Sequence, residues 1–227
     1  MNLNLNLNLK GIFAFLSVFF LLFIFFYFDL SNFLSLKNLK SHLNTWESLY
    51  QNHSFLFILF FSLIYIIACF GIPITIPLML ISGAIFGKIL GTIIALLCAT
   101  LGGGLAFLFT RHFFQSFVYR KYGHFLNKIE NQLMASPFLY IFGIRISGMV
   151  PHLIANILFG ISHVPFRTFF FASFFGMAPV IFIYVQAGSM LMKLENTSDI
   201  LSGKNLLSLS LLAGIFLFSA LFKRFKR

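Results

Sequence analysis

The chain has 227 residues, of which 59% are hydrophobic, 19% aromatic and only 9% charged. Because a soluble domain carries roughly 25% charged residues, this composition excludes an ordinary soluble globule and indicates an integral membrane protein. The net charge of +11 comes largely from basic residues beside apolar runs, which favours anionic lipid headgroups over nucleic acid as partners. The two cysteines, Cys69 and Cys98, lie within apolar runs and are expected to be small core residues.

The first 53 residues form the first predicted unit, an anchor followed by an amphipathic link. Gly11–Phe28 is free of charge and long enough to cross a hydrocarbon layer of ~30 Å. No small-residue cleavage site follows it, so we expect a retained anchor and not a removed signal peptide. Apolar residues recur every three or four positions in Phe33–His53, which predicts either an interfacial helix or a loop helix packed on the helical bundle.

Residues 54–192 form the second predicted unit, the membrane core. Charge-free runs predict transmembrane helices at Ser54–Phe70, Ile89–Thr110 and Thr168–Met192. Two further apolar stretches, 71–88 and 136–162, contain residues that interrupt helices. Such backbone is tolerated at membrane depth only where it is buried in protein or lines a wet cavity, so each stretch predicts a re-entrant helical hairpin. The predicted hairpin breakers are Pro73, Pro77, Gly148 and Pro151.

The two broken stretches share a pattern of spacing. In each, a proline is followed nine or ten residues later by the glycine of a Phe-Gly pair, and another glycine comes sixteen residues after that. Such small residues allow helices to approach closely. The glycines expected at close helix contacts are Gly83, Gly87, Gly103, Gly160 and Gly176. We therefore predict an all-α membrane protein with about five transmembrane helices and two opposed re-entrant hairpins, related as an inverted repeat.

Residues 193–227 form the third predicted unit, a C-terminal span and tail. Asn205–Phe222 is the last charge-free run, and four of the final five residues are basic. Arg111–Ser136, between the two halves of the core, also carries four basic residues. Because basic loops stay on the cytoplasmic side, both segments, and with them the C-terminus, are predicted to face the cytoplasm.

Arg145 is the most informative polar residue, because it lies within an apolar stretch. An arginine at such depth costs at least ~2.5 kcal/mol to insert unless it faces a cavity or a partner. No acid lies near it in the sequence. A guanidinium binds phosphate in a bidentate manner, so we expect Arg145 either to bind a lipid phosphate or to clamp backbone carbonyls of the broken hairpin.

Three other residues are candidates for substrate binding, each with a structural alternative. Arg111 ends an apolar run, where snorkelling to the interface is the alternative. Asn156 either binds a headgroup or holds broken backbone. His152 is the intramembrane group expected to titrate near neutral pH, and a satisfied buried imidazole is its alternative.

The sequence contains no arrangement of residues typical of an enzyme. We find no paired carboxylates, no Ser/His/Asp spacing, no Cys/His metal cluster and no phosphate-binding loop. We therefore expect neither catalysis nor a cofactor or metal ion.

Several segments together resemble the DedA superfamily, and most closely its SNARE-associated branch, which carries the VTT domain. The first half contributes Ile81–Gly87, Gly91 and Phe107–Arg111. The second half contributes Arg145, Gly148, Pro151, Asn156 and Gly160, then Phe166, Phe169, Gly176, Pro179, Tyr184 and Gly188. Gly148 stands where that branch has a proline, which relaxes the broken backbone. The resemblance covers about Pro73–Ser189.

This resemblance implies two opposed re-entrant hairpins and movement of lipid between leaflets. Bacterial members are linked to recycling of undecaprenyl phosphate or to flipping of phosphatidylethanolamine, and eukaryotic relatives scramble phospholipids. Many bacterial members carry acids in or near the first hairpin, but residues 54–128 contain no Asp or Glu. Proton coupling through a carboxylate is therefore not expected here.

The sequence as a whole predicts a flippase- or scramblase-like lipid transporter in a bacterial inner membrane, moving a phospholipid or polyprenyl phosphate whose headgroup phosphate is stabilised by Arg145. Its partners would be anionic membrane lipids, not nucleic acid, and a homo-oligomer is left open. One alternative is an ion- or proton-coupled carrier of a small solute that uses His152. Another is a non-transporting membrane protein that supports envelope assembly.

Overall fold

The computed structural model describes residues 45–70, 72, 74–116, 118, 130, 133–148 and 150–191. All regular elements in these ranges are helices, which confirms the all-α prediction for this part of the chain. They are α4 (Ser54–Ala68), α5 (Thr75–Phe86), α6 (Lys88–Phe113), α8 (Pro137–Ser147), α9 (His152–Ile161) and α10 (Phe166–Leu191). The predicted spans at 11–28 and 205–222, Pro73 and the basic C-terminal tail lie outside the described residues, so their predicted topology stays a prediction.

Two of the described helices, α6 and α10, are long and apolar enough to cross a membrane. They correspond to the predicted spans at Ile89–Thr110 and Thr168–Met192. One face of α6 carries exposed aliphatic side chains, at Ile93, Leu97, Leu101, Leu105 and Leu108. The opposite face carries small buried residues, among them Gly91, Ala95, Ala99 and Gly103. This division suits a helix that turns one face to lipid and packs the other closely against protein.

The remaining four helices are shorter, and this differs from the predicted span at Ser54–Phe70. That segment forms α4, which has 15 residues and falls short of the ~20 residues that a perpendicular crossing needs. The chain leaves the helix at Cys69 and begins α5 only after Ile74. In the second half α8 has 11 residues and α9 has 10. Within the described ranges 54–113 and 137–191, two short helices are thus followed by one long helix in each half.

The break between α8 and α9 lies where the sequence predicts it. Gly148 caps α8 in the left-handed conformation, with φ of 61°, and Pro151 is the residue before the first turn of α9. The left-handed conformation suits glycine, and proline suits the start of a helix. Gly148 and Pro151 therefore act as the predicted breakers.

Pro77 and Gly87 differ from their predicted roles. Pro77 lies in the first turn of α5, where backbone N–H groups have no partner within the helix, so it is accommodated and does not break the helix. Gly87 forms the sharp turn between α5 and α6, with φ of 77° and ψ of 176°, and a Cβ there would meet no atom within 4 Å. Its role is thus conformational and not close packing, since this backbone region is open essentially to glycine alone.

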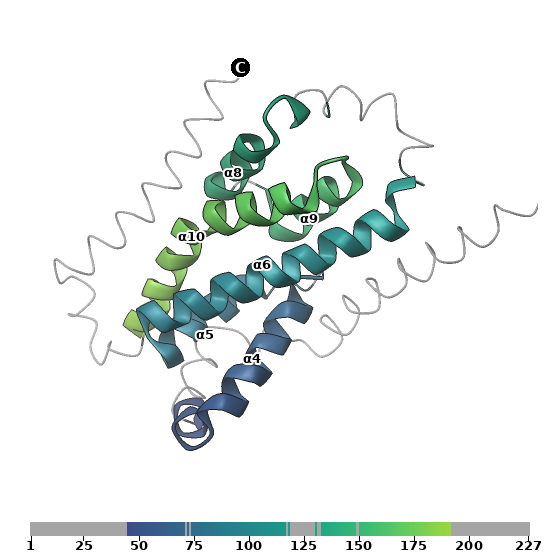
Figure 1. Ribbon diagram of the computed structural model, residues 1–227. Coiled ribbons are helices and arrows are strands. Elements are labelled where there is room, and N and C mark those ends of the chain that lie inside the picture. Colours follow the sequence, from purple (N-terminus) through teal and green to yellow (C-terminus); the bar gives the residue numbers. More distant parts are fainter. Residues whose placement is uncertain are drawn as a thin grey trace, which may run out of the picture.

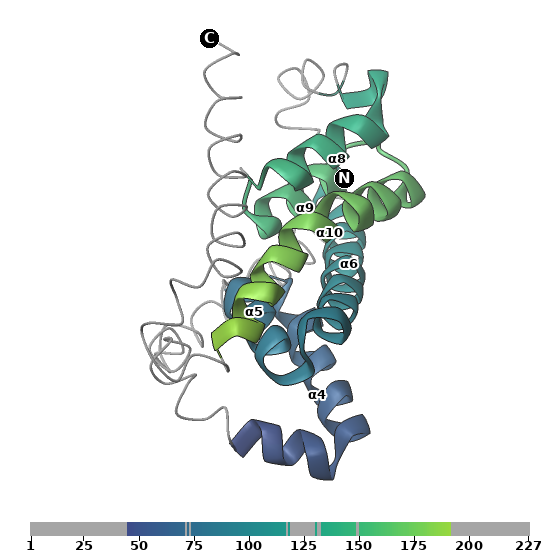
Figure 2. The same ribbon diagram turned by 90° about the vertical axis from the view of Figure 1, so that its left-hand side faces the viewer.

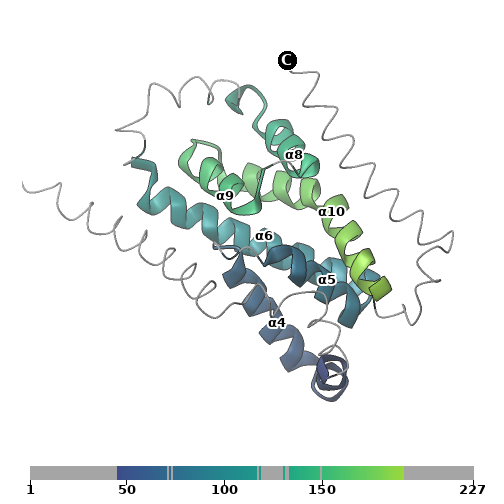
Figure 3. The same ribbon diagram turned by 180° about the vertical axis from the view of Figure 1, so that it is seen from behind.

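The two halves interlock through their long helices. Helix α5 packs against α10 from the other half, and α9 packs against α6. Figure 1 shows α6 crossing the molecule, with α4 and α5 on one side and α8 and α9 on the other. The view from behind in Figure 3 shows the same order. Figure 2 shows that α10 changes direction along its length, which we attribute to Pro179 inside the helix.

Glycines make this interlocking possible. A Cβ at Gly83 on α5 would overlap the carbonyl of Val185 on α10, and a Cβ at Gly160 on α9 would lie 2.8 Å from the carbonyl oxygen of Phe107 on α6. A Cβ at Gly176 would lie 2.7 Å from the Cβ of Arg145. Any side chain at these positions would force the helices apart.

The described part of the N-terminal link lies against the bundle. Residues 45–52 are helical, and both Trp46 and Tyr50 pack on the core that α4, α5, α6 and α10 share. For this segment the structure favours the packed loop helix over the interfacial helix.

Candidate functional site

Arg145, near the end of α8, lies in a polar cluster enclosed by apolar residues. Only 6% of its surface is exposed. Its Nε donates to Ser173 Oγ on α10 at 3.1 Å, its Nη1 contacts His152 Nδ1 at 3.4 Å, and its Nη2 donates to Asn156 Oδ1 at 2.6 Å. We call these four residues the Arg145 cluster. All three partners are neutral side chains from two other helices.

The positive charge of this cluster is not neutralised by any carboxylate that the structure describes. The ion pair found among the described residues joins Glu130 to His163, and Arg145 takes no part in it. A guanidinium in an apolar interior requires hydrogen-bond partners to offset its lost hydration. Ser173, His152 and Asn156 supply such partners but no negative charge, which leaves the cluster electropositive.

The local sequence explains how these groups meet. Gly148 and Pro151 turn the chain back after α8, so Arg145 and the first turns of α9 face one another. His152 and Asn156 are four residues apart, which places them on the same face of α9. Gly176 on α10 lets α8 approach, and Ser173, one turn earlier on α10, then reaches the guanidinium.

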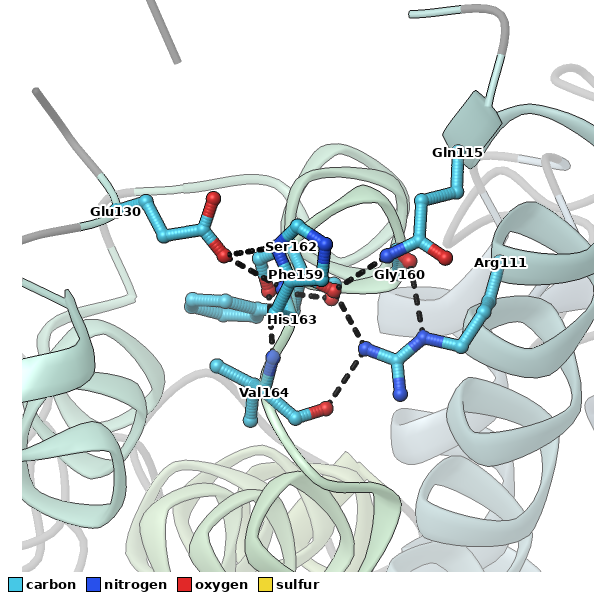
Figure 4. Close-up of polar contacts among 8 residues, drawn as sticks. All are labelled: Arg111, Gln115, Glu130, Phe159, Gly160, Ser162, His163 and Val164. Atoms are coloured by element: carbon cyan, nitrogen blue, oxygen red, sulfur yellow. Dashed lines mark hydrogen bonds and ion pairs between the residues drawn. The ribbon is translucent and has the colours of Figure 1, made fainter. Parts of the chain in front are cut away.

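Arg111, at the end of α6, makes contacts of a different kind (Figure 4). Its Nη2 donates to the carbonyl oxygens of Ser162 at 2.6 Å and Val164 at 2.7 Å, and its Nε donates to Gly160 at 3.4 Å. These carbonyls belong to the last turn of α9 and the linker to α10. Helix ends leave carbonyls without partners, and cationic side chains can satisfy them there. Arg111 thus clamps the α9–α10 linker.

Two more polar side chains hold the same linker. Gln115 Nε2 donates to the Ser162 carbonyl at 3.2 Å, from the segment that follows α6. On the other side of the linker in Figure 4, Glu130 Oε1 accepts from the backbone N–H of His163 at 2.8 Å and lies 2.7 Å from its Nδ1. We call Arg111, Gln115, Glu130 and the linker at 160–164 the linker clamp.

A pair of buried aromatic rings connects the two arginines. The rings of Phe107 on α6 and Phe169 on α10 stack with centroids 4.3 Å apart. The Arg111 Cζ lies 4.4 Å from the Phe107 centroid, and the Arg145 Cζ lies 5.3 Å from the Phe169 centroid. Both separations fall within the range of a cation–π interaction.

The structure brings three predicted site residues together and sets the fourth apart. Arg145, His152 and Asn156 form one cluster, whereas Arg111 lies in the linker clamp. Arg145 contacts side chains and does not clamp backbone carbonyls, which was one of its two predicted roles. Arg111 makes the carbonyl contacts instead.

Sequence reasoning did not find Ser173, Gln115 or Glu130, whose contacts join segments distant in the sequence. Among the described residues there is no group of three or more His, Cys, Asp or Glu side chains that could hold a metal ion, and the expected lack of a metal site stays a prediction.

Comparison with known proteins gives one family. Residues 72–190 match the VTT domain family. The chain is 31% identical over 205 residues to an uncharacterized membrane protein of Arabidopsis thaliana, covering 83% of this chain and 66% of that protein. It is 33% identical over 132 residues to a transmembrane protein 41 homolog of Caenorhabditis elegans, covering 57% of this chain and 54% of that protein. The chain thus spans between about half and two thirds of the length of these relatives. No solved structure matches it.

Proposed function

The chain belongs to the VTT domain family of membrane proteins, and on that premise we propose that it moves a phosphate-bearing lipid between membrane leaflets. The headgroup would pass through the interior of the helical bundle while the acyl chains remain in the bilayer. The chemical class of the substrate is a phospholipid or a polyprenyl phosphate.

The observation that supports this proposal best is the uncompensated charge of Arg145. The guanidinium is buried, and no described carboxylate pairs with it. Its hydrogen bonds go to the neutral acceptors of Ser173, His152 and Asn156. A phosphate brings the negative charge that the cluster lacks, and guanidinium–phosphate contacts are stronger than neutral hydrogen bonds.

The packing of the helices supports a site between the two halves. The short helices α5 and α9 each pack against the long helix of the opposite half. Two opposed re-entrant hairpins would pack in this reciprocal way. Inverted repeats place their substrate sites at the interface between the two halves. In this proposal the Arg145 cluster lies on the headgroup path, at the point where α6, α8, α9 and α10 meet.

The proposal assigns Arg111 a supporting role. Three backbone carbonyls already accept hydrogen bonds from its guanidinium. Releasing it to bind a substrate would leave those carbonyls without their donor, which is costly for partly buried groups. Arg111 therefore keeps the end of α9 in place for the Arg145 cluster.

Reconstitution tests the proposal directly. The purified full chain would be placed in liposomes with a trace of fluorescent phospholipid or polyprenyl phosphate, and exchange between leaflets would be followed by chemical quenching of the outer leaflet. We expect exchange well above that of protein-free liposomes without an imposed proton gradient, because residues 54–128 contain no acid. Exchange equal to that of empty liposomes across the lipid panel would reject lipid transport.

The same liposomes separate the alternatives. A proton-coupled solute carrier predicts uptake that depends on a pH gradient and on His152. The contact of His152 Nδ1 with Arg145 weighs against this, because a guanidinium only donates, so the ring nitrogen that would have to take up the proton already accepts a hydrogen bond. A non-transporting assembly protein predicts neither uptake nor exchange, with function lost through changes in residues 111–136 and unchanged in Arg145→Ala.

A further inference from the structure

Two donors in the Arg145 cluster have no hydrogen-bond partner among the described residues. Among the residues that the structure describes, three buried side-chain atoms lack a partner: Tyr65 Oη, His152 Nε2 and Asn156 Nδ2. Tyr65 belongs to the core around α4 and α5, whereas the other two atoms belong to residues four positions apart, on one face of α9. Asn156 is fully buried. Buried polar atoms without partners are rare in proteins, and each one calls for an explanation.

The contacts of Arg145 determine the character of both atoms. All N–H groups of a guanidinium are donors, so His152 Nδ1 must accept in its contact with Arg145. A neutral imidazole with an accepting Nδ1 carries its proton on Nε2, which is then a donor. Asn156 Oδ1 likewise accepts from Arg145, which leaves the Nδ2 amide group as a donor. Arg145 thereby fixes the tautomer of one residue and the amide orientation of the other.

His152 and Asn156 lie at the contact between α9 and α6, His152 through its Nε2 and Asn156 through its Oδ1. A Cβ built on Gly103 of α6 would be 3.3 Å from both His152 Nε2 and Asn156 Oδ1. We call Gly103, His152 and Asn156 the α6–α9 seam. The groups of this seam without a described partner are two buried N–H donors beside a buried positive charge, and no described carboxylate is bonded to any member of the seam.

We infer that the α6–α9 seam binds a phosphate group, with the Nε2–H of His152 and the Nδ2–H of Asn156 as its direct donors and Arg145 as the positioning residue that aims them. An anionic oxygen matches the two donors in hydrogen-bonding character and Arg145 in charge. The inference deepens the proposed function and rests on it for one point, namely that the phosphate belongs to a lipid headgroup and not to free phosphate. His152 acts here as a neutral donor, unlike its role in a proton-coupled carrier.

Asn156→Asp is the sharpest test. Aspartate keeps an acceptor oxygen for Arg145 but replaces the Nδ2 donor with a negatively charged acceptor of nearly the same size. If Asn156 only holds Arg145, the charge pair keeps or raises the stability of the fold. If Asn156 donates to phosphate, binding is lost through both the missing donor and charge repulsion. Asn52→Asp makes the same chemical change at an exposed position on the helix of residues 45–52 and serves as the matched control.

Binding would be measured on the full chain in a neutral detergent, as the ligand-dependent rise in unfolding temperature. The probes are short-chain phosphatidic acid, inorganic phosphate, and diacylglycerol, which lacks phosphate. We expect phosphatidic acid to stabilise the wild type and Asn52→Asp alike, diacylglycerol to have no effect, and Asn156→Asp to bind phosphatidic acid at least about tenfold more weakly. Binding by Asn156→Asp within about threefold of the wild type would overturn the inference.

A second pair of variants covers the case in which Asn156→Asp does not fold. His152→Gln keeps one acceptor and one donor, whereas His152→Leu removes both. We expect the glutamine variant to bind phosphatidic acid more tightly than the leucine variant, and equal binding by the two would contradict the donor role of His152.

The inference and the proposed function fail in different ways. If the wild type binds no phosphate probe but exchanges lipid in liposomes, the inference is wrong and the transport function stands. If it binds phosphatidic acid through the seam but exchanges no lipid, the inference stands and transport is wrong. Binding of inorganic phosphate as tight as that of phosphatidic acid would support the donors and reject the lipid as the source of the phosphate.

Discussion

The linker clamp and the Arg145 cluster each centre on one arginine, but the two arginines are used differently. Arg111 donates to backbone carbonyls, whereas Arg145 contacts the side chains of Ser173, His152 and Asn156. A backbone carbonyl at a helix end has few other partners, so its arginine is a permanent part of the fold. Side chains can turn and exchange partners, so the Arg145 cluster, and not the linker clamp, is the one that a ligand can engage. The role of an arginine in an apolar chain, structural or ligand-binding, is thus shown by the groups that it contacts and not by its depth in the membrane alone.

The largest expected effect is loss of the linker clamp. Arg111→Ala removes the donor of three carbonyls at the end of α9, and we expect it to lower the free energy of unfolding by about 3 kcal/mol, since hydrogen bonds from charged groups contribute ~1.5–3 kcal/mol each and the site is partly solvated. Denaturant unfolding in detergent micelles measures this. Arg167→Ala, at an exposed arginine near the start of α10, is the control. A value near that of the control would show that the clamp does not stabilise the fold.

Gly160→Ala tests the same region through packing. The added Cβ would lie 2.8 Å from the backbone oxygen of Phe107 and from Thr110 Cβ, and a backbone atom does not move aside easily. Overpacking of this kind typically costs 1–3 kcal/mol, and we expect about 2 kcal/mol in the same unfolding assay. Gly143→Ala is a suitable comparison, because a Cβ there would meet no atom of the described residues within 4 Å. Equal stability of the two variants would mean that α9 and α6 are not in close contact.

Arg145→Ala is expected to act on transport more than on stability. Leaflet exchange should fall at least about tenfold, which corresponds to ~1.4 kcal/mol, because the phosphate loses its positive charge and His152 and Asn156 lose the group that orients them. The unfolding free energy should change less than in Arg111→Ala, since removing an unneutralised buried charge offsets the lost hydrogen bonds. The reverse ranking of the two arginines in both assays would contradict the comparison.

The smallest effect is expected at the exposed edge of the clamp. Glu130→Gln keeps an acceptor for the His163 backbone N–H but removes the charge that faces the imidazole. The His163 side chain is 61% exposed and that of Glu130 12%, and an ion pair that is open to solvent on one side contributes at most about 1 kcal/mol. We expect a change below this value, measured by the same unfolding assay at neutral pH. A loss of unfolding free energy as large as that of Arg111→Ala would show that Glu130, and not Arg111, contributes most to the linker clamp.

The sequence predicted those parts of the fold that depend on local chemistry. The charge-free runs identified α6 and α10, and Gly148 with Pro151 marked the break after α8. Pro77 misled the prediction because a proline interrupts a helix in its interior but not in its first turn, and the sequence does not show where α5 begins.

The two arginines also differ in how far local sequence predicts their role. Arg145 was recognisable as a site residue because a charge within an apolar run is unusual. Asn156 was marked by the family resemblance, and His152 by being a titratable residue in an apolar stretch. The role of Arg111 was not recognisable, because every residue has a backbone carbonyl and the sequence does not show which of them Arg111 contacts. Ser173 was missed for a related reason, since one serine in α10 gains its role only when α8 is packed beside it.

The stacked rings of Phe107 and Phe169 constrain how such a protein can move. They connect the two long helices. The Phe107 ring also contacts the Arg111 guanidinium, and the Phe169 ring contacts that of Arg145. Sliding α6 past α10 by one helical turn, ~5.4 Å, would separate the rings and break both cation contacts at once. We therefore expect α6 and α10 to keep a fixed register and serve as the rigid frame, so that the passage of a headgroup is left to rearrangement of the short helices around them.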